Sequence, residues 1–155
     1  MSGLLHYEDV TVGLQFDTGG IDVTESHIVQ FAGLSGDFFD IHMDDTFARE
    51  LGFPRRVAHG ILCLALIDGL KNRAAERFAG VASLHWDWSF RGPVFAGDRL
   101  SARIEVTAKR LTSKGDRGIL TLRITASNQH GTVVQEGTNL LLVRRRSERI
   151  GEGQA

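Results

Sequence analysis

Apolar and polar residues alternate along the second half of the chain, and this alternation predicts β-strands. In residues 81–90 the apolar side chains fall at every second position, at Ala82, Leu84, Trp86, Trp88 and Phe90. The same pattern occupies residues 100–108 and 120–126, and a fourth apolar run, residues 140–143, follows Val133 and Val134. Short connectors rich in Gly, Pro, Asn and Asp separate these runs. Consecutive strands with short links predict an antiparallel meander that has one apolar face.

The segment from Ala58 to Phe78 predicts the helix that covers this apolar face. Its first half, residues 61–70, is apolar nearly all round, as in a buried helix. Its second half turns polar, and Gly80 is expected as the C-terminal stop. A long central helix wrapped by an antiparallel sheet is the hotdog arrangement, of class α+β. We expect one such domain over residues 1–146, with residues 147–155 as a polar, disordered tail.

Shorter elements are predicted before the central helix. Thr24 and Asp44 are each suited to cap a helix. The first helix would bury Ile28, Phe31 and Ala32 and end at Gly33 or Gly36, and the second would bury Phe47, Ala48 and Leu51. Segments 14–16 and 20–23 predict a short hairpin, and the segment between the two helices, residues 36–43, is expected to be a loop.

Composition and charge exclude several classes of protein. The 155 residues are 42% hydrophobic and 24% charged, and the formal net charge of −1 argues against a nucleic-acid binder held by phosphate contacts. The most apolar stretch, residues 61–70, is about half of a membrane span and contains Asp68, so no membrane segment is expected. The single cysteine, Cys63, suits a small core position and a reducing cytoplasm.

The segment SGDFFDIHMDDTFA, residues 35–48, carries the candidate chemistry. Asp37 and His42 offer a carboxylate and an imidazole, the groups that general acid–base catalysis uses most. Taken alone, this spacing is weak evidence. Asp37 could equally cap a turn after Gly36, and His42 could be an interior histidine whose hydrogen bonds are satisfied.

Together with the segment VAHG at residues 57–60, these residues resemble the MaoC-like family of hotdog-fold hydratases and dehydratases. The family signature is matched at Gly36, Asp37, Ile41, His42, Ala48, His59 and Gly60. The segment FRGPVFAGDRL, residues 90–100, is similar to the family's third element, and the resemblance spans roughly residues 10–145. The chain departs from the family at Phe39 and Asp40, where the signature has Asn and Pro, a departure that bears on substrate preference and rate.

The resemblance implies hydration of 2-enoyl-CoA thioesters, or dehydration of (R)-3-hydroxyacyl-CoA thioesters, with no metal and no organic cofactor. Asp37 and His42 would hold the water that adds to the double bond. The resemblance also assigns to Gly60 the stabilisation of the charge that develops on the thioester oxygen. The position of Gly60 at a helix start suits the same role, because first-turn N–H groups have no intrahelical partner and lie at the positive end of the helix dipole.

Neighbouring residues are expected to contact the acyl-CoA. These are Phe39, Asp40, Ile41, Ala58 and His59. His59 more plausibly positions the helix start than takes part in chemistry, and Asp40 either faces solvent or tunes His42. Arg55 and Arg56 precede the helix start and are candidates for the phosphates of coenzyme A, with ordinary surface charge as the alternative. The resemblance also implies a homodimer with joined sheets and sites at the subunit contact.

Other interpretations of the same residues remain open. The acidic residues and histidine at positions 37, 40, 42, 44 and 45 could suggest a metal site, since carboxylates and imidazole bind several divalent ions. Asp44 and Asp45 are better explained by a helix N-cap and first turn. An acyl-CoA-binding accessory subunit with little activity is an alternative function, motivated by Phe39 and Asp40. A hotdog thioesterase is another.

Overall fold

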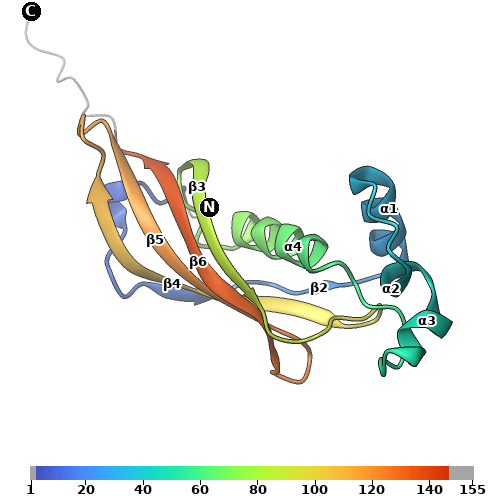
Figure 1. Ribbon diagram of the computed structural model, residues 1–155. Helices are drawn as coiled ribbons and strands as arrows, with labels where there is room; N and C mark the ends of the chain where they lie inside the picture. Colours follow the sequence, from blue (N-terminus) through green and yellow to red (C-terminus); the bar gives the residue numbers. More distant parts are fainter. Residues whose placement is uncertain (1–2, 147–155) are drawn as a thin grey trace, which may run out of the picture.

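A curved antiparallel sheet wraps around one helix, α4 (Gly60–Arg73), which confirms the expected hotdog arrangement (Figure 1). The computed structural model describes residues 3–146. The predicted tail, residues 147–155, therefore lies outside the described residues.

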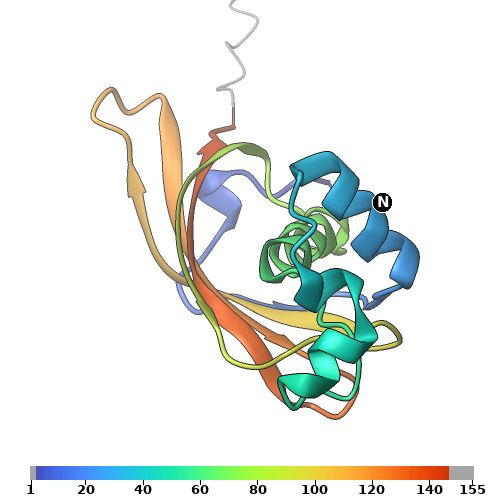
Figure 2. The ribbon, with the colours of Figure 1, turned by 45° about the vertical axis from the view of Figure 1, so that its right-hand side comes forward.

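After η1 and two short strands, the α-helices precede the four long strands along the chain. The helices are η1 (Tyr7–Asp9, a 3-10 helix), α1 (Glu25–Ser35), α2 (Asp40–Met43), α3 (Asp45–Glu50) and α4. The strands are β1 (Gln15–Asp17), β2 (Ile21–Asp22), β3 (Gly80–Phe90), β4 (Arg99–Leu111), β5 (Arg117–Ser127) and β6 (Val133–Arg144). Figure 2 shows the sheet curving around α4, with α1, α2 and α3 gathered beside that helix on the open side of the sheet.

The strand order is β1-β4-β5-β6-β3, with β2 also paired to β4. Strands β4, β5 and β6 form the predicted meander, but β3 pairs with β6 and lies at the free edge of the sheet. The prediction of a four-strand meander is therefore wrong for β3, because the connection at residues 91–98 carries the chain across the sheet to β4. The predicted N-terminal hairpin is also wrong, since β1 and β2 each pair with β4 and not with each other.

The predicted alternation holds in β4 and β5 and fails in β3. The inward residues of β4 are buried as far as Val106, and Ala108 is exposed because the register shifts between these two residues. In β3 the register shifts twice, and Ala82, Leu84 and Phe90 are exposed instead of inward. Trp86 and Trp88 do pack against the core. An edge strand with such irregularities has no second neighbour to enforce its alternation.

Helix α4 is shorter than predicted and is not buried all round. It ends at Arg73 because residues 77–79 run in extended form beside Leu5, which accepts from the N–H of Ala79 and donates to the carbonyl of Arg77. Gly80 consequently begins β3 instead of ending the helix. One face of α4 packs into the sheet through Leu62, Cys63, Ile67 and Leu70, whereas Ile61 on the other face is 56% exposed.

The short helices confirm both predicted caps. The Thr24 hydroxyl accepts from the N–H of His27, and the Asp44 carboxylate accepts from the N–H groups of Thr46 and Phe47. Helix α1 ends at Gly36, whose φ of 80° is in the left-handed region that favours glycine. Leu51 is exposed, against the prediction. Helix α2 lies in the segment expected to be a loop and carries His42 on its single turn.

Candidate active site

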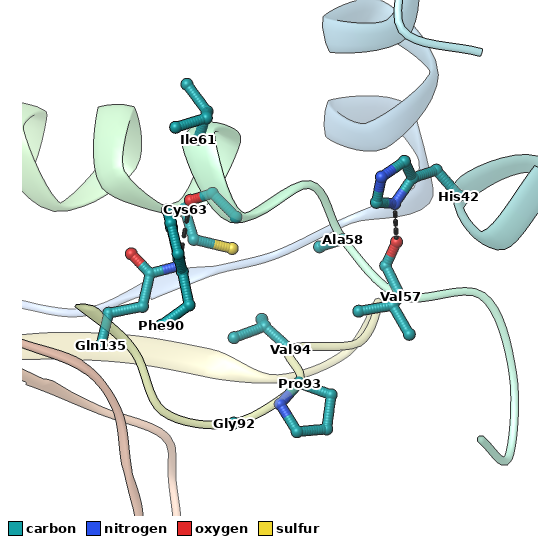
Figure 3. A pocket seen from close by; sticks show the side chains of 11 residues that line it. His42, Val57, Ala58, Ile61, Cys63, Phe90, Gly92, Pro93, Val94 and Gln135 are labelled. Atoms are coloured by element: carbon teal, nitrogen blue, oxygen red, sulfur yellow. Dashed lines mark hydrogen bonds between the residues drawn. The ribbon is translucent and has the colours of Figure 1, made fainter. Parts of the chain in front are cut away.

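A cavity of about 320 Å³ lies at the N-terminal end of α4 (Figure 3). It is bounded by the first turn of α4, by segment 92–94 and by His42 from α2. The lining residues are mostly apolar and comprise His42, Val57, Ala58, Gly60, Ile61, Cys63, Phe90, Gly92, Pro93, Val94 and Gln135. Of the ten residues expected at the site, His42, Ala58 and Gly60 therefore line the cavity directly.

His42 is held in one orientation by the main chain. Its Nδ1 lies 2.6 Å from the carbonyl oxygen of Val57, and the N–H of Val57 donates to the carbonyl of Ile41 at 3.0 Å. Because a carbonyl oxygen accepts only, Nδ1 carries the proton in this contact. The Nε2 atom of the neutral ring is then an acceptor, and it faces Asp37.

Asp37 lies in the loop between α1 and α2 and faces the same imidazole. Its Oδ2 is 4.0 Å from Nε2 of His42, and its side chain is 51% exposed. The other oxygen, Oδ1, accepts from the N–H of Phe39 at 3.3 Å. A separation of 4.0 Å is too long for a direct hydrogen bond. The structure thus brings the two predicted residues together with a gap between their functional atoms.

His59 lies behind this pair and contacts both members. It is 2% exposed, and its Nε2 donates to the carbonyl oxygen of Asp37 at 2.9 Å. Its ring stacks on that of His42 with a centroid distance of 3.8 Å and an angle of 26°. Phe31 of α1 contacts the His59 ring at 5.0 Å. His59 Nδ1 is buried without a hydrogen-bond partner in the described part of the chain.

The start of α4 presents main-chain N–H groups to the cavity. No side chain in residues 3–146 caps this helix at its N-cap residue, His59. Just before the helix, Ala58 donates its N–H to the carbonyl of Val94 at 2.7 Å, which fixes the approach of the chain. A Cβ atom at Gly60 would lie 2.7 Å from Cε1 of Phe90. The absence of a side chain at Gly60 therefore leaves room for the Phe90 ring beside the helix start.

The remaining expected residues lie around the mouth of the site. Phe39 is 60% exposed, and its ring lies edge-on to that of His42 at 6.5 Å. Asp40 begins α2 and is exposed, as expected. Arg55 is exposed, with its guanidinium 5.8 Å from the centroid of the Phe95 ring. Arg56 instead forms ion pairs with Glu25 at 3.0 Å and with Asp45 at 3.5 Å.

Two carboxylates of the acidic segment, those of Asp44 and Asp45, are already bonded within the fold. Asp44 caps α3, and Asp45 accepts from the N–H of Arg56 in addition to its ion pair. Asp37, His42 and His59 each offer one ligand atom, all within 4.8 Å of one another. These three groups could hold an ion or a water molecule, and two of them, Asp37 and His42, are the expected acid–base pair.

Eight of the eleven lining residues were not expected at the site, and Gln135 and Cys63 are two of them. Gln135 of β6 is 2% exposed and donates from Nε2 to the carbonyl of Gly60 at 3.0 Å. The only sequence signal is a polar residue directly after the apolar pair Val133–Val134. Cys63 is buried as expected, and it also forms part of the cavity wall. Burial, with a smaller effect of Asp98, raises the pKa of its thiol to about 12.

The fold is that of the hotdog proteins, and the relatives of the chain assign it to the hydro-lyase class of enzymes. The chain belongs to the MaoC-like domain family, whose model matches residues 9–136. It is 35% identical to an (R)-specific enoyl-CoA hydratase of Aeromonas caviae over 114 residues, which cover 72% of this chain and 80% of the relative. It is 32% identical to an (R)-specific enoyl-CoA hydratase of Rhodospirillum rubrum over 90% of this chain and 93% of that protein.

Comparison with solved structures agrees with this assignment. A MaoC-like dehydratase from Rhodospirillum rubrum superposes with a TM-score of 0.83 at 30% identity, covering 93% of this chain and 99% of the other. The suspected family and the hotdog fold are thereby confirmed. Across residues 3–146, none of the helices has the length and apolar character needed to cross a membrane.

Proposed function

We propose that the protein hydrates 2-enoyl-CoA thioesters, and dehydrates (R)-3-hydroxyacyl-CoA thioesters, with Asp37 and His42 as its acid–base pair. The observation that carries this proposal is the position of the pair. Nε2 of His42 and Oδ2 of Asp37 face each other across 4.0 Å, beside the start of α4, whose first-turn N–H groups have no side-chain cap. Membership of the MaoC-like family supports the same reaction.

The gap between Asp37 and His42 suits one shared water molecule. A water about 2.8 Å from each group can donate one hydrogen to the Asp37 carboxylate and the other to Nε2 of His42. Both side chains accept, so the oxygen of the water keeps a lone pair free for attack on C3 of the enoyl group. Phe39, edge-on to His42, would limit the directions from which the substrate approaches this oxygen.

In the hydration direction His42 acts first as base and then as acid. The water oxygen bonds to C3 as its proton passes to Nε2, and the C2–C3 π electrons move to the thioester oxygen. The Asp37 carboxylate stabilises the imidazolium of His42, and so does the hydrogen bond that His42 Nδ1–H donates to the carbonyl oxygen of Val57. Nε2 then returns a proton to C2, which restores the thioester carbonyl and the neutral imidazole. Positioned proton transfer of this kind contributes about 10²–10⁴-fold in rate.

The thioester oxygen would accept from N–H groups of the first turn of α4, starting at Gly60. These donors lie at the positive end of a 14-residue helix, and their position is fixed before substrate binds. The acyl group would occupy the apolar cavity, walled by Ala58, Val94 and Cys63. Arg55 is better placed than Arg56 for the phosphates of coenzyme A, because Glu25 and Asp45 already pair with Arg56.

A second copy of the chain is expected to complete the enzyme as a homodimer. Strand β3 is the free edge of the sheet, and its residues Leu84 and Phe90 are 50% and 53% exposed. Ile61 on the outer face of α4 is also exposed and lines the cavity wall. Pairing of two β3 edges would cover these apolar groups beside the site. The single cysteine is consistent with our expectation of a cytoplasmic location.

The function is tested by following the enoyl-thioester absorbance after addition of the protein to a series of 2-enoyl-CoAs of increasing chain length. We expect absorbance to fall, an (R)-3-hydroxyacyl-CoA to form, and the rate to persist in the presence of a chelator. Asp37→Asn and His42→Ala should each lose at least about 10²-fold in kcat. Glu50→Gln is the control, because Glu50 is an exposed carboxylate of α3 that is not among the residues expected at the site.

The alternatives give different results in the same assay. An accessory subunit would bind acyl-CoA without turnover until a partner protein is added. A thioesterase would release free coenzyme A, which a thiol probe detects. Unchanged rates in Asp37→Asn and His42→Ala would refute the assigned pair while leaving the reaction itself established.

A further inference from the structure

Gln135 connects the start of α4 to two strands of the sheet. Its Nε2 donates to the carbonyl oxygen of Gly60 at 3.0 Å, and its Oε1 accepts from Nε1–H of Trp88 at 2.9 Å. The indole N–H can only donate, so it fixes which end of the Gln135 amide faces Gly60. One side chain of β6 thereby joins β3 to the first residue of the helix whose N–H groups face the cavity.

The surroundings of Gln135 are built to hold this orientation. Its side chain is almost wholly buried. Gln135 lines the cavity at one end, and His42 lines it at the other (Figure 3). Gly137, two residues along β6, lets β3 approach closely, since a Cβ there would clash with the main-chain oxygen of Asp87 and lie 2.7 Å from Cε3 of the Trp88 indole. A buried amide with both ends bonded is costly to rotate, because rotation leaves unsatisfied groups in an apolar site.

We propose that Gln135 is a positioning residue for the hydration reaction, one that holds the first turn of α4 where its N–H groups meet the thioester oxygen. This inference rests on the proposed function. The carbonyl of Gly60 and the N–H of Ile61 belong to one peptide unit, so a bond to this carbonyl restrains the turn directly. Donors aimed at developing charge are effective only when they are held rigidly in place.

The same strand offers a matched control for this role. Asn139 is likewise a buried amide of β6 that bonds to α4 and to β3, through Lys71 Nζ at 3.2 Å and the His85 carbonyl at 3.1 Å. Its bond to α4 is made 11 residues beyond Gly60, roughly 16 Å along the helix axis. Asn139 therefore shares the structural features of Gln135 but not its place at the helix start.

The experiment compares Gln135→Met, Trp88→Phe and Asn139→Leu in the full-length protein. Gln135→Met keeps the length of the side chain without its amide, and we expect kcat to fall about 10- to 100-fold with KM within about three-fold of wild type. Trp88→Phe frees the amide to rotate and should lower kcat less. The double variant should be no slower than Gln135→Met, because both changes act on one connection. Asn139→Leu should keep the wild-type kcat.

Amide hydrogen exchange gives a readout that does not depend on turnover. The N–H of Cys63 donates to the carbonyl of His59 at 3.1 Å in the first turn of α4. Gln135→Met should speed its exchange about 5- to 10-fold, the factor for one lost hydrogen bond, and leave that of Leu70 unchanged. If Gln135→Met fails to fold, exchange at Cys63 is read in Trp88→Phe instead, where the Gln135 amide is free to rotate away from Gly60 and exchange should also be faster.

Any one of three results would overturn the positioning role. The first is an unchanged exchange rate at Cys63 in Gln135→Met, and the second is an unchanged kcat in the same variant. The third is an equal loss of kcat in Asn139→Leu, which would attribute the effect to general packing. If the wild-type protein hydrates no enoyl-CoA, the proposed function fails and the catalytic part of this inference fails with it. The exchange measurement would then still decide whether Gln135 holds the helix start.

Discussion

His42 and His59 stack ring on ring at 3.8 Å, and each donates one ring N–H to a main-chain carbonyl of another segment. His42 bonds to Val57, which precedes α4, and His59, the N-cap of α4, bonds to Asp37 in the loop after α1. The two imidazoles thus join the loop that carries Asp37, α2 and the start of α4 into one unit. His59 thereby contacts both members of the expected catalytic pair.

From this relationship we expect His59→Phe to impair turnover more than binding. Phenylalanine keeps the ring that stacks on His42 but leaves the part-buried carbonyl of Asp37 without its donor, a loss of about 0.5–1.5 kcal/mol for a typical hydrogen bond. Displacement of Asp37 should lower kcat by about 10-fold or more with a small change in KM. His59→Gln, whose amide can still donate, should recover part of the loss. Steady-state kinetics of both variants would show this, and equal rates in the two would contradict it.

Much of the fold was predictable because it depends on local signals. The alternation in β4 and β5, the cap residues Thr24 and Asp44 and the apolar run of α4 each reflect a contact made within a few residues or with one face of the core. The grouping of Asp37, His42 and Gly60 followed from the family resemblance. Their spacing along the chain would not have been sufficient.

What could not be predicted depends on contacts between distant segments. The end of α4 at Arg73 is set by pairing of residues 77–79 with Leu5, and the place of β3 is set by the edge that β6 leaves open. Gln135 is a polar residue in an apolar strand, and its partners Gly60 and Trp88 lie 75 and 47 positions away in the sequence. The hydrophobic periodicity of the sequence does not predict hydrogen bonds between residues so far apart along the chain.

Gly60→Ala should impair the site through Phe90. The added Cβ would lie 2.7 Å from Cε1 of Phe90, a half-exposed ring that can move. We expect the free energy of unfolding to fall by about 1–3 kcal/mol, as in overpacked cores, and kcat/KM to fall because the displaced ring enters the cavity. Adding Phe90→Leu should restore stability in chemical denaturation. If the double variant stayed as unstable as Gly60→Ala, contact with Phe90 would not explain the glycine.

Cys63 should resist thiol reagents in the native protein. Its side chain is fully buried, and burial raises the pKa of the thiol to about 12, so the reactive thiolate is scarce near neutral pH. We expect negligible modification by a chromogenic disulfide at about pH 8, and rapid stoichiometric modification once denaturant unfolds the chain. Fast labelling of the folded protein would show instead that the cavity opens to reagents of that size.

Glu8 should make stability depend on acid pH, because it ties η1 to the end of β6. Its carboxylate accepts from the main-chain N–H of Arg146 at 2.9 Å and from Nε of Arg145 at 2.7 Å. The N–H of Arg146 is the largest cause, followed by Arg145, of a pKa lowered from 4.5 to about 2. A lowered folded-state pKa stabilises the fold above the unfolded value of 4.5, and this contribution disappears as pH falls through about 2.

The measurement is the free energy of unfolding of wild type and Glu8→Gln, from denaturant titrations at a series of pH values. We expect wild type to be the more stable by a constant margin above about pH 5.5, with the margin shrinking as the pH falls toward 2. High salt should reduce the margin throughout, since these groups are near the surface. The Arg146 N–H belongs to the main chain. In an Arg146→Ala background, the stability margin between Glu8 and Glu8→Gln should therefore keep most of its pH dependence. A margin independent of pH would show that Glu8 is not held as a carboxylate by these contacts.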